Sequence, residues 1–482
     1  MADQNSNQLL AFFTAMDNQG NVIVKGNAPA CRPDGCWLTT IPDAPKLDLD
    51  LYISNYKGRT RFDRLLLIGQ SSVPLCVDAL KAAIVEAKKG KDTQRYRNAW
   101  EAIRIAAPNE PEAQWDQAWL DKTEQSNKTE THRLDIELKQ YKNNLVRESI
   151  RIGYRDIGLH QESIGDLQAA QDAFLRMRGE ASTQSHLLEV ARHLISAMVQ
   201  RRDWPSVLAN VNKMLSGSLS ENDLKAQQPY QKVVTGIANL HSEKYYEAAK
   251  NFLETGDLPA CQLLNDVISP NDVATYGGLL ALASMDRAEL QSRVLNNTSF
   301  RSYLELESHI RKAINMFVNG RYSQCLAILE SYRPDYLLDI HLQAHVPAIY
   351  SQIRTKCIVQ YFIPFSCVTL DSMNEAFAKP GESLEAELVT MIRSGKLLAR
   401  INTIDRLLVA VSSDRRVEMQ VKALEAAKNY EKEALERIRR MSIIAADLEV
   451  KGGGRKGNGP GGSGISEVWY EETRKGIAES SF

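Results

Sequence analysis

The feature that most constrains the fold of this 482-residue chain is its apolar spacing, which is helical almost without interruption from Leu47 onward. Apolar residues recur at steps of three and four, as in Cys76, Leu80 and Ala83, and turn formers such as Gly90 separate the segments. This period places the apolar side chains of each segment on one face of a helix. Short breaks between such helices make them antiparallel neighbours. The sequence therefore predicts an all-α fold with one small β hairpin near its end.

Pairs of these helices repeat beyond residue 139. Gly158 is followed by Phe174 and Gly236 by Phe252, so a small residue where two helices cross is followed by a bulky residue on the next helix. Gly320 begins a third occurrence of the pattern. Such spacing is typical of tetratricopeptide-like units. Because one unit cannot bury its apolar face alone, we expect the units to stack into a solenoid.

The pattern changes at Asp339. A Pro-Gly pair and a Ser-Gly pair interrupt the helical spacing, and two short runs of β-forming residues follow. Three helices and a hairpin, in this order, are typical of a winged-helix fold. The expected helices are 340–361, 370–377 and 383–393, and the expected strands are Leu397–Ile401 and Leu407–Val411.

A single long helix is predicted over residues 414–450. Its apolar residues form a stripe at three- and four-residue steps, and the opposite face is charged. A stripe of this kind at the end of a chain needs a partner surface. It is too long for a small winged helix to cover, so its second half should project. The stripe comprises Val417, Val421, Leu424, Ala427, Ala434, Ile438, Met441, Ala445 and Leu448.

These patterns divide the chain into six segments. Gly452–Gly464 holds eight glycines in thirteen residues and cannot pack, so it is predicted to be a flexible linker. The polar, proline-containing N-terminus is typical of a mobile arm. The expected segments are a flexible arm (1–46), an N-terminal helical region (47–138), a helical-repeat array (139–338), a winged-helix subdomain (339–412), a C-terminal assembly helix (413–450), and a glycine-rich linker with a tail (451–482).

Composition and charge argue against several classes of protein. The formal net charge is -1, from 59 Lys plus Arg against 60 Asp plus Glu, without the basic excess of a nucleic-acid-binding protein. The third winged-helix helix, which would enter a DNA groove, carries Glu382, Glu385 and Glu387 against Arg393 and would repel phosphates. Seven scattered cysteines argue against a disulfide framework. No signal peptide or long apolar run is evident, so we expect a chain of the cytoplasm and nucleus that binds neither nucleic acid nor membrane.

No constellation of catalytic or metal-binding residues stands out. The glycine-rich stretch lacks the Gly-Lys-Ser/Thr ending of a phosphate-binding loop, and no Gly-x-Ser-x-Gly motif occurs. His341 and His345 are four residues apart, but a zinc protease needs Glu after the first His, and here Leu342 follows. Cys31 and Cys36 could form half a zinc site, but no second close pair exists. We therefore expect no catalytic residue, no cofactor and no metal.

The order of a helical-repeat array, a winged helix and a terminal helix resembles the PCI-domain family. Its members build the proteasome lid, the COP9 signalosome and a translation initiation factor. Within the family the similarity is greatest to the COP9 signalosome members. The stretches that carry it are Leu47–Tyr52, Arg61–Leu65, Tyr141–Arg151, Val273–Ala283, Ser299–Glu307 and His345–Arg354.

The resemblance implies a non-catalytic scaffold in the complex that removes Nedd8 from cullins. Its partners would be other PCI subunits and, through them, the metalloprotease subunit and cullin-RING ligases. PCI subunits align through the edges of their winged helices, and their last helices gather into one bundle. The residues expected at the edge are Leu397, Leu398, Ile401 and Leu407, and those expected in the bundle are Leu424, Ala434, Ile438, Met441, Ala445 and Leu448.

Three alternatives stay open at this point. The paralogous subunit of the proteasome lid has the same architecture, although the segment Leu47–Leu65 favours the signalosome. A winged-helix nucleic-acid-binding protein is opposed by the acidic third helix. An enzyme of another type would need a constellation that the sequence does not display.

Overall fold

The computed structural model describes residues 30–31, 37–38, 41–215, 221–256, 266–377, 383–411 and 415–446. It contains two compact units, Met1–Ala410 and Val411–Phe482. The described part is mostly helical, as predicted, and includes a two-stranded sheet of β1 (Ala30–Cys31) and β2 (Trp37–Leu38). Within that part, no helix combines the length and apolarity that a membrane span requires.

The N-terminal region forms a small helical module with its own core. Asp92 caps α5 as predicted, because its carboxylate accepts hydrogen bonds from two first-turn N–H groups. Ile41 is buried in this core, and its backbone is hydrogen-bonded to Ser71 and Val73. Residues 41–46 therefore belong to the folded module rather than to the predicted arm. The helices are α2 (Leu49–Ser54), α3 (Gly58–Ser71), α4 (Cys76–Lys89), α5 (Thr93–Ala106) and η1 (Pro111–Ala113).

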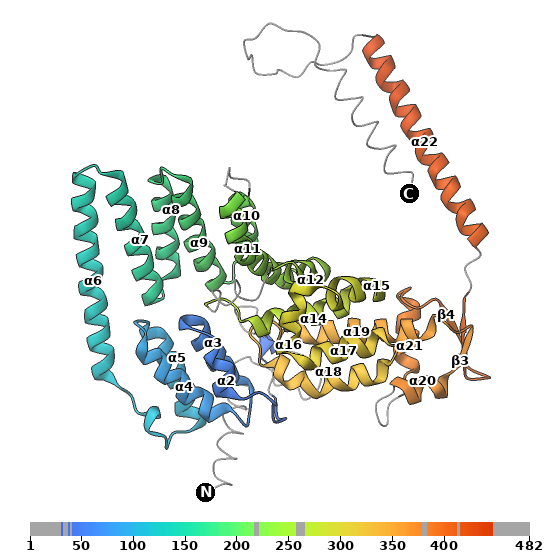
Figure 1. The fold of residues 1–482 in the computed structure, drawn as a ribbon, viewed down its shortest axis with the longest axis horizontal. Helices are drawn as coiled ribbons and strands as arrows, with labels where there is room; N and C mark the ends of the chain where they lie inside the picture. The colour runs from blue at the N-terminus through green and yellow to red at the C-terminus, as the bar shows by residue number, and fades with distance from the viewer. Residues whose placement is uncertain are drawn as a thin grey trace. The chain divides into compact units, whose positions relative to one another are not determined.

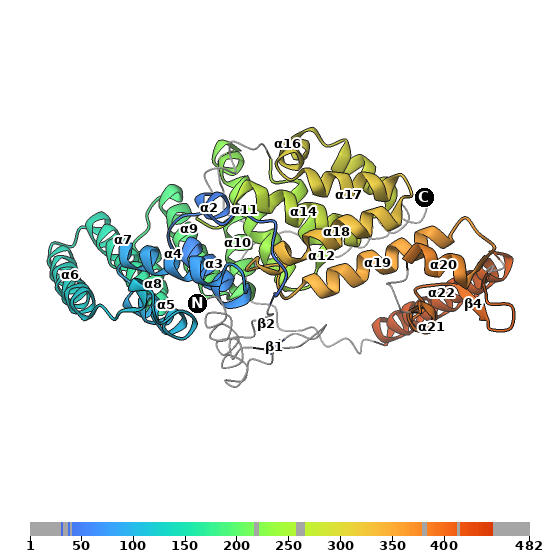
Figure 2. The ribbon, with the colours of Figure 1, turned by 90° about the horizontal axis from the view of Figure 1, so that it is seen from below.

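Successive helices of the repeat array pack against one another from α6 to α12 and on to α14 (Figure 1). Figure 2 shows α17, α18 and α19 side by side near α14, which is apolar on all faces and buried. The helices are α6 (Gln117–Asn143), α7 (Arg147–Ile164), α8 (Leu167–Gly179), α9 (Gln184–Gln200), α10 (Trp204–Leu215), α11 (Glu221–His241), α12 (Tyr245–Leu253), α14 (Pro270–Ser284), α15 (Arg287–Glu289), η3 (Leu290–Leu295), α16 (Thr298–Leu306), α17 (Ser308–Val318) and α18 (Tyr322–Leu337).

Two of the glycines predicted at helix crossings do lie there. A Cβ atom on Gly158 would be 2.3 Å from the ring of Phe174, and one on Gly236 would be 2.8 Å from the ring of Phe252. These helices can approach so closely only because the crossing residue has no side chain. Gly320 is different, because it has open space around it and a φ of 77°. It supplies the left-handed turn after α17, so the predicted third packing glycine is wrong.

The winged-helix region follows a set of turns. The helix predicted from residue 340 begins only at Val346, because Leu338–His345 form turns that place Asp339. A strand that the sequence analysis missed joins the predicted hairpin, and the antiparallel order is β3-β5-β4. The elements are α19 (Val346–Phe362), β3 (Cys367–Thr369), α20 (Leu370–Phe377), α21 (Glu385–Arg393), β4 (Ala399–Asn402) and β5 (Leu407–Ala410).

One hydrophobic core runs from the repeat array into the winged helix. It extends from Ala170 to Leu408 without a division between the two regions. The core of the N-terminal module spans Ile41 to Leu120 and takes in Leu338, from the turns between α18 and α19. The winged helix is therefore rigidly continuous with the array, and the N-terminal module packs on the junction between them.

The second unit is described through one helix, α22 (Arg415–Ala445). The end of the predicted helix, including Leu448, lies outside the described residues. Apolar side chains are exposed along all of α22, from Val417 to Ile444. Within this unit the helix therefore presents apolar side chains over its whole described length.

Candidate assembly surfaces

The sheet of the winged helix has two outer strands, and the hydrogen bonds to its middle strand show which backbone groups are free. Leu370 N donates to Arg406 O, and Ala410 N donates to Ser366 O, each at 2.8 Å. In an antiparallel pair the N–H and C=O of one residue point to the same side, and successive residues alternate. The even-numbered residues at and around β5 therefore face β3.

The odd-numbered residues of β5 face the other way, towards β4. Leu407 and Val409 oppose Asn402 and Arg400, which direct their backbone groups inward to β5. Ile401 lies between these two residues, so its N–H and C=O point to the free side of the sheet. The free edge of β4 is thus centred on the backbone of Ile401.

Of the four residues predicted for this edge, one lies on it. Ile401 has outward backbone groups, whereas Leu407 belongs to the middle strand and is paired on both sides, so its assignment to the edge was wrong. Leu397 precedes β4 and its side chain is buried. Leu398 exposes its side chain, but it is two residues before Arg400, so its backbone groups point inward like those of Arg400. The sequence correctly identified the outer strand and misassigned residues around it, because register decides which residue faces outward.

The second predicted surface is the apolar side of α22. Leu424, Ile438 and Met441 are exposed, Ala445 is exposed and Ala434 is half-buried. At 100° per residue, the apolar side chains cover an arc of about 260°, which is wider than the predicted stripe. Large residues that the stripe omitted are Met419, Tyr430, Leu435, Ile443 and Ile444, all exposed.

A buried polar cluster, which the sequence analysis missed, joins segments that are distant in the sequence. The Arg64 side chain on α3 is fully buried and donates to Asp339 Oδ2 at 2.6 Å and to Asp272 Oδ2 at 2.9 Å. Tyr56 OH donates to Asp272 at 2.7 Å, and Tyr276 OH donates to Asp339 at 2.7 Å. This Arg64 cluster fastens the N-terminal module to α14 and to the turns before α19.

The charges of the Arg64 cluster are unequally balanced, since one guanidinium serves two carboxylates. Burial raises the pKa of Asp272, by more than the Arg64 charge lowers it. Burial would also raise the pKa of Asp339, but Arg64 and His341 hold it below its usual value. Asp272 is positioned by a capping box with Ser269 at the start of α14. The arrangement contains no nucleophile beside a base, and it acts as a structural clamp.

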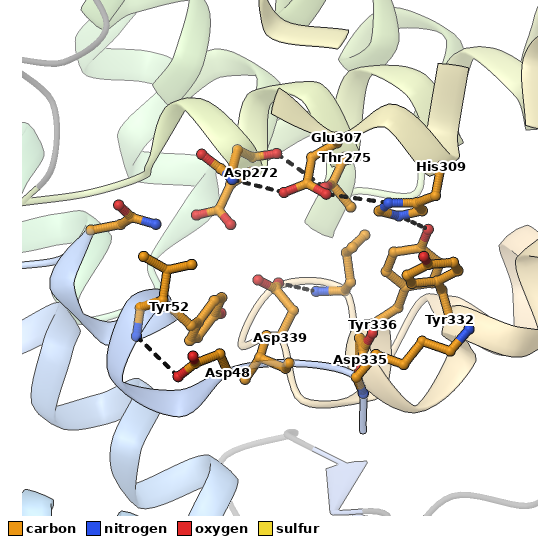
Figure 3. A pocket seen from close by; sticks show the side chains of 16 residues that line it. Asp48, Tyr52, Asp272, Thr275, Glu307, His309, Tyr332, Asp335, Tyr336 and Asp339 are labelled. Carbon is orange, nitrogen blue, oxygen red and sulfur yellow. Dashed lines mark hydrogen bonds and ion pairs between the residues drawn. The ribbon is translucent and has the colours of Figure 1, made fainter. Parts of the chain in front are cut away.

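A pocket of about 340 Å³ lies beside this cluster (Figure 3). Its carboxylates bind groups of the chain itself: Asp335 accepts from Lys46 N at 2.9 Å and Glu307 from Asn271 Nδ2 at 2.8 Å. His309 is hydrogen-bonded to Tyr336 OH at 2.8 Å, and burial lowers the pKa of His309 to about 4. Because these polar groups are already hydrogen-bonded within the chain, we interpret the pocket as part of the interface where the N-terminal module packs on the repeat array.

The predicted histidine pair lies in the turns before α19 and not on a helix face. His241 joins it, with its Nε2 atom 3.1 Å from Nδ1 of His341, and Trp204 stacks on His241 at 4.2 Å. We call His241, His341 and His345 the histidine cluster. Burial lowers the pKa of His241 to about 2 and that of His341 to about 3, and it lowers the pKa of His345 as well.

Neither a metal site nor a DNA-reading helix emerges from these residues. Across the described ranges, no three His, Cys, Asp or Glu side chains are placed to hold a metal ion, and Cys36 lies outside those ranges. On α21, Glu387 accepts from Arg354 Nε at 2.9 Å and Glu385 accepts from Arg406 Nη2 at 3.5 Å. Arg354 and Arg406 are therefore used within the winged helix, and α21 itself carries Glu385 and Glu387 against the one cation Arg393, so it is unsuited to bind phosphates.

Comparison with known proteins connects these surfaces to a family. The family model described as 26S proteasome subunit RPN7 matches residues 116–293, and the PCI domain model matches residues 329–411. COP9 signalosome complex subunit 1 of Neurospora crassa is 50% identical over 448 residues, which are 93% of this chain and 95% of that protein. The subunit 1 proteins of Emericella nidulans and Arabidopsis thaliana are 47% and 34% identical, over 86% and 84% of this chain and 85% and 91% of their own lengths.

The extent of these matches decides between the two paralogous scaffolds that the sequence analysis left open. The proteasome model covers part of the repeat array, whereas the signalosome proteins match nearly from end to end. Such a match includes the N-terminal module, the array and the winged helix together. The chain belongs to the family of COP9 signalosome complex subunit 1, whose members are non-catalytic PCI-domain scaffolds.

Proposed function

We propose that this chain assembles with the other subunits of a COP9 signalosome through two surfaces, the apolar side of α22 and the free edge of β4. Through these subunits it would support the metalloprotease subunit, which removes Nedd8 from the cullins of cullin-RING ligases. Its own contribution would be to hold other subunits in place, because its buried polar groups connect parts of the fold and do not form a catalytic site. The expected locations are the cytoplasm and the nucleus, where such ligases act.

The observation that carries this proposal is the exposure of α22. Its apolar side chains include Leu435 and Ile444 as well as the predicted Leu424, Ile438 and Met441, and all of them are exposed in the single chain. A helix that docks in one groove needs an apolar stripe of about 100°. An arc of about 260° fits a helix covered from more than one side, as in a bundle built by several subunits.

The β4 edge supports a second contact of a different kind. The outward N–H and C=O of Ile401 can pair with a strand of a neighbouring subunit, and backbone pairing of this type adds a strand to an existing sheet. The core shared by the winged helix and the array gives this edge a fixed direction. One neighbour would therefore be held by strand pairing and several by helix packing.

The match of the RPN7 model to residues 116–293 makes the proteasome lid the assembly against which the proposal is tested. The array alone does not separate the two assemblies. A lid subunit would share the same kinds of surface but would have different neighbours.

The decisive experiment is affinity purification of the tagged chain from its native cells, with mass spectrometry of the co-purifying proteins. We expect the other signalosome subunits in comparable amounts. Cells that lack the chain should accumulate Nedd8-modified cullin, and the wild-type chain should restore its removal. Recovery of proteasome lid subunits instead, or unchanged cullin modification in the deletion strain, would refute the proposal.

A further inference from the structure

A small groove opens where α8 ends, α9 begins and α10 ends, and it shares no residue with either proposed assembly surface. Leu194 and Met214 are buried at its floor, while Leu187 on its wall remains 38% exposed. Arg178 and Lys213 lie at its rim. We call this depression the α9 groove.

The charge around the α9 groove is of one sign. Among the described residues that line it, Arg178 and Lys213 are cations and none is a carboxylate. Arg178 is exposed and makes no ion pair with any other residue that the structure describes. The groove also lies at the N-terminal end of α9, whose backbone dipole is positive there. The rim therefore favours negatively charged groups.

The volume of the groove limits the size of the group that it can bind. Its volume is about 160 Å³. Sites for drug-sized ligands occupy roughly 300–1,000 Å³, whereas a cavity of about 150 Å³ lined by apolar side chains accommodates benzene. The α9 groove thus fits one bulky apolar side chain, such as that of Leu, Met or Phe, and is too small for a cofactor.

We propose that the α9 groove binds an acidic peptide segment of another protein. One bulky apolar side chain of the segment would enter between Leu187, Leu194 and Met214, and a flanking Asp or Glu residue would lie beside Arg178. The apolar contact supplies most of the affinity, and the rim charges select acidic over basic sequences. The groove is distinct from α22 and β4, so this contact does not depend on either.

Two pairs of substitutions separate the groove from its surroundings. The groove variant carries Leu187→Asp and Arg178→Glu, which place a carboxylate on the apolar wall and reverse the charge at the rim. The control variant carries Leu175→Asp and Arg176→Glu, the same chemical changes on α8 at residues that do not line the groove. Leu175 is 45% exposed, close to the 38% of Leu187, so both variants should remain folded, which melting curves check.

The test is a selection from a random peptide library displayed on phage against the full chain, with counter-selection on the groove variant. Enriched peptides should carry one bulky apolar residue flanked by acidic residues. In fluorescence anisotropy, a synthetic peptide of this sequence should bind the groove variant at least about tenfold more weakly, bind the control variant as it does the wild type, and lose affinity with salt.

Three results would overturn the proposal. One is the absence of any peptide that distinguishes the wild type from the groove variant. Another is enrichment of peptides without acidic residues. The third is binding only after deletion of residues 452–482, which would assign the groove to the chain's own tail.

Discussion

Replacing both Ile438 and Met441 with Asp should prevent the chain from entering its complex while leaving the isolated chain folded. The two side chains are 59% and 69% exposed in the single chain, so most of their apolar surface is available for burial by partners. Full burial of such a side chain contributes about 1.5–3 kcal/mol. Scaled by the exposed fractions, the pair would contribute roughly 2–4 kcal/mol to assembly.

The introduced carboxylates add to this loss, because a charge buried without a partner costs several kcal/mol or forces its own protonation. A total of at least about 3 kcal/mol corresponds to more than a hundredfold weaker association. The melting temperature of the isolated variant should stay close to that of the wild type, since neither residue is buried within the chain.

The assay is co-purification of the signalosome subunits with tagged variants, combined with thermal unfolding of each purified chain. The matched control carries Asn429→Asp and Arg440→Gln, which change the net charge by the same amount on the charged face of α22. This control should assemble normally. The reasoning is refuted if the Ile438/Met441 variant co-purifies at wild-type yield, or if it unfolds on its own.

Four further outcomes are expected. Ile401→Pro should weaken assembly with one neighbour but spare the chain, because the lost N–H faces outward, whereas Arg400→Pro should destabilise the sheet itself in a melting experiment. Arg64→Met should lower the free energy of unfolding in urea by about 3–5 kcal/mol, and adding Asp272→Asn should restore part of the loss. The histidine cluster should make the free energy of unfolding fall as pH drops from about 6.5 towards 3, because only the unfolded state binds protons on these histidines. The fall should reach up to about 1.4 kcal/mol per histidine and pH unit. A free energy of unfolding that stays constant over this range in urea titrations would contradict this. The purified chain alone should carry no stoichiometric zinc and no isopeptidase activity, which one zinc per chain in elemental analysis would disprove.

The sequence predicted those parts of the fold that depend on local spacing. Asp92 marked the start of α5, and the crossings of Gly158 with Phe174 and of Gly236 with Phe252 followed from a small residue and a bulky one at a fixed interval. Each of these signals acts within a helix pair. The period of the apolar residues is enough to read them, because neighbouring helices in a repeat array are also neighbours in the sequence.

The Arg64 cluster was not predictable on these terms. Arg64 is 208 positions from Asp272 and 275 positions from Asp339 along the chain. An arginine on an amphipathic helix ordinarily belongs to the solvated face. One signal did exist: Ser269 and Asp272 around Pro270 form a capping box, which identifies the start of α14 but not the cation that its carboxylate binds.

The two assembly surfaces differ in how far a sequence can define them. The apolar arc of α22 is a property of one helix, so its period alone reveals it, and the structure only widens it. The edge of the sheet is a property of pairing: Ile401 faces outward because Arg400 and Asn402 oppose Val409 and Leu407. A shift of one residue would turn Ile401 inward and Arg400 outward. Substitutions that probe the edge must therefore be chosen from the register, and those that probe the helix can be chosen from the sequence.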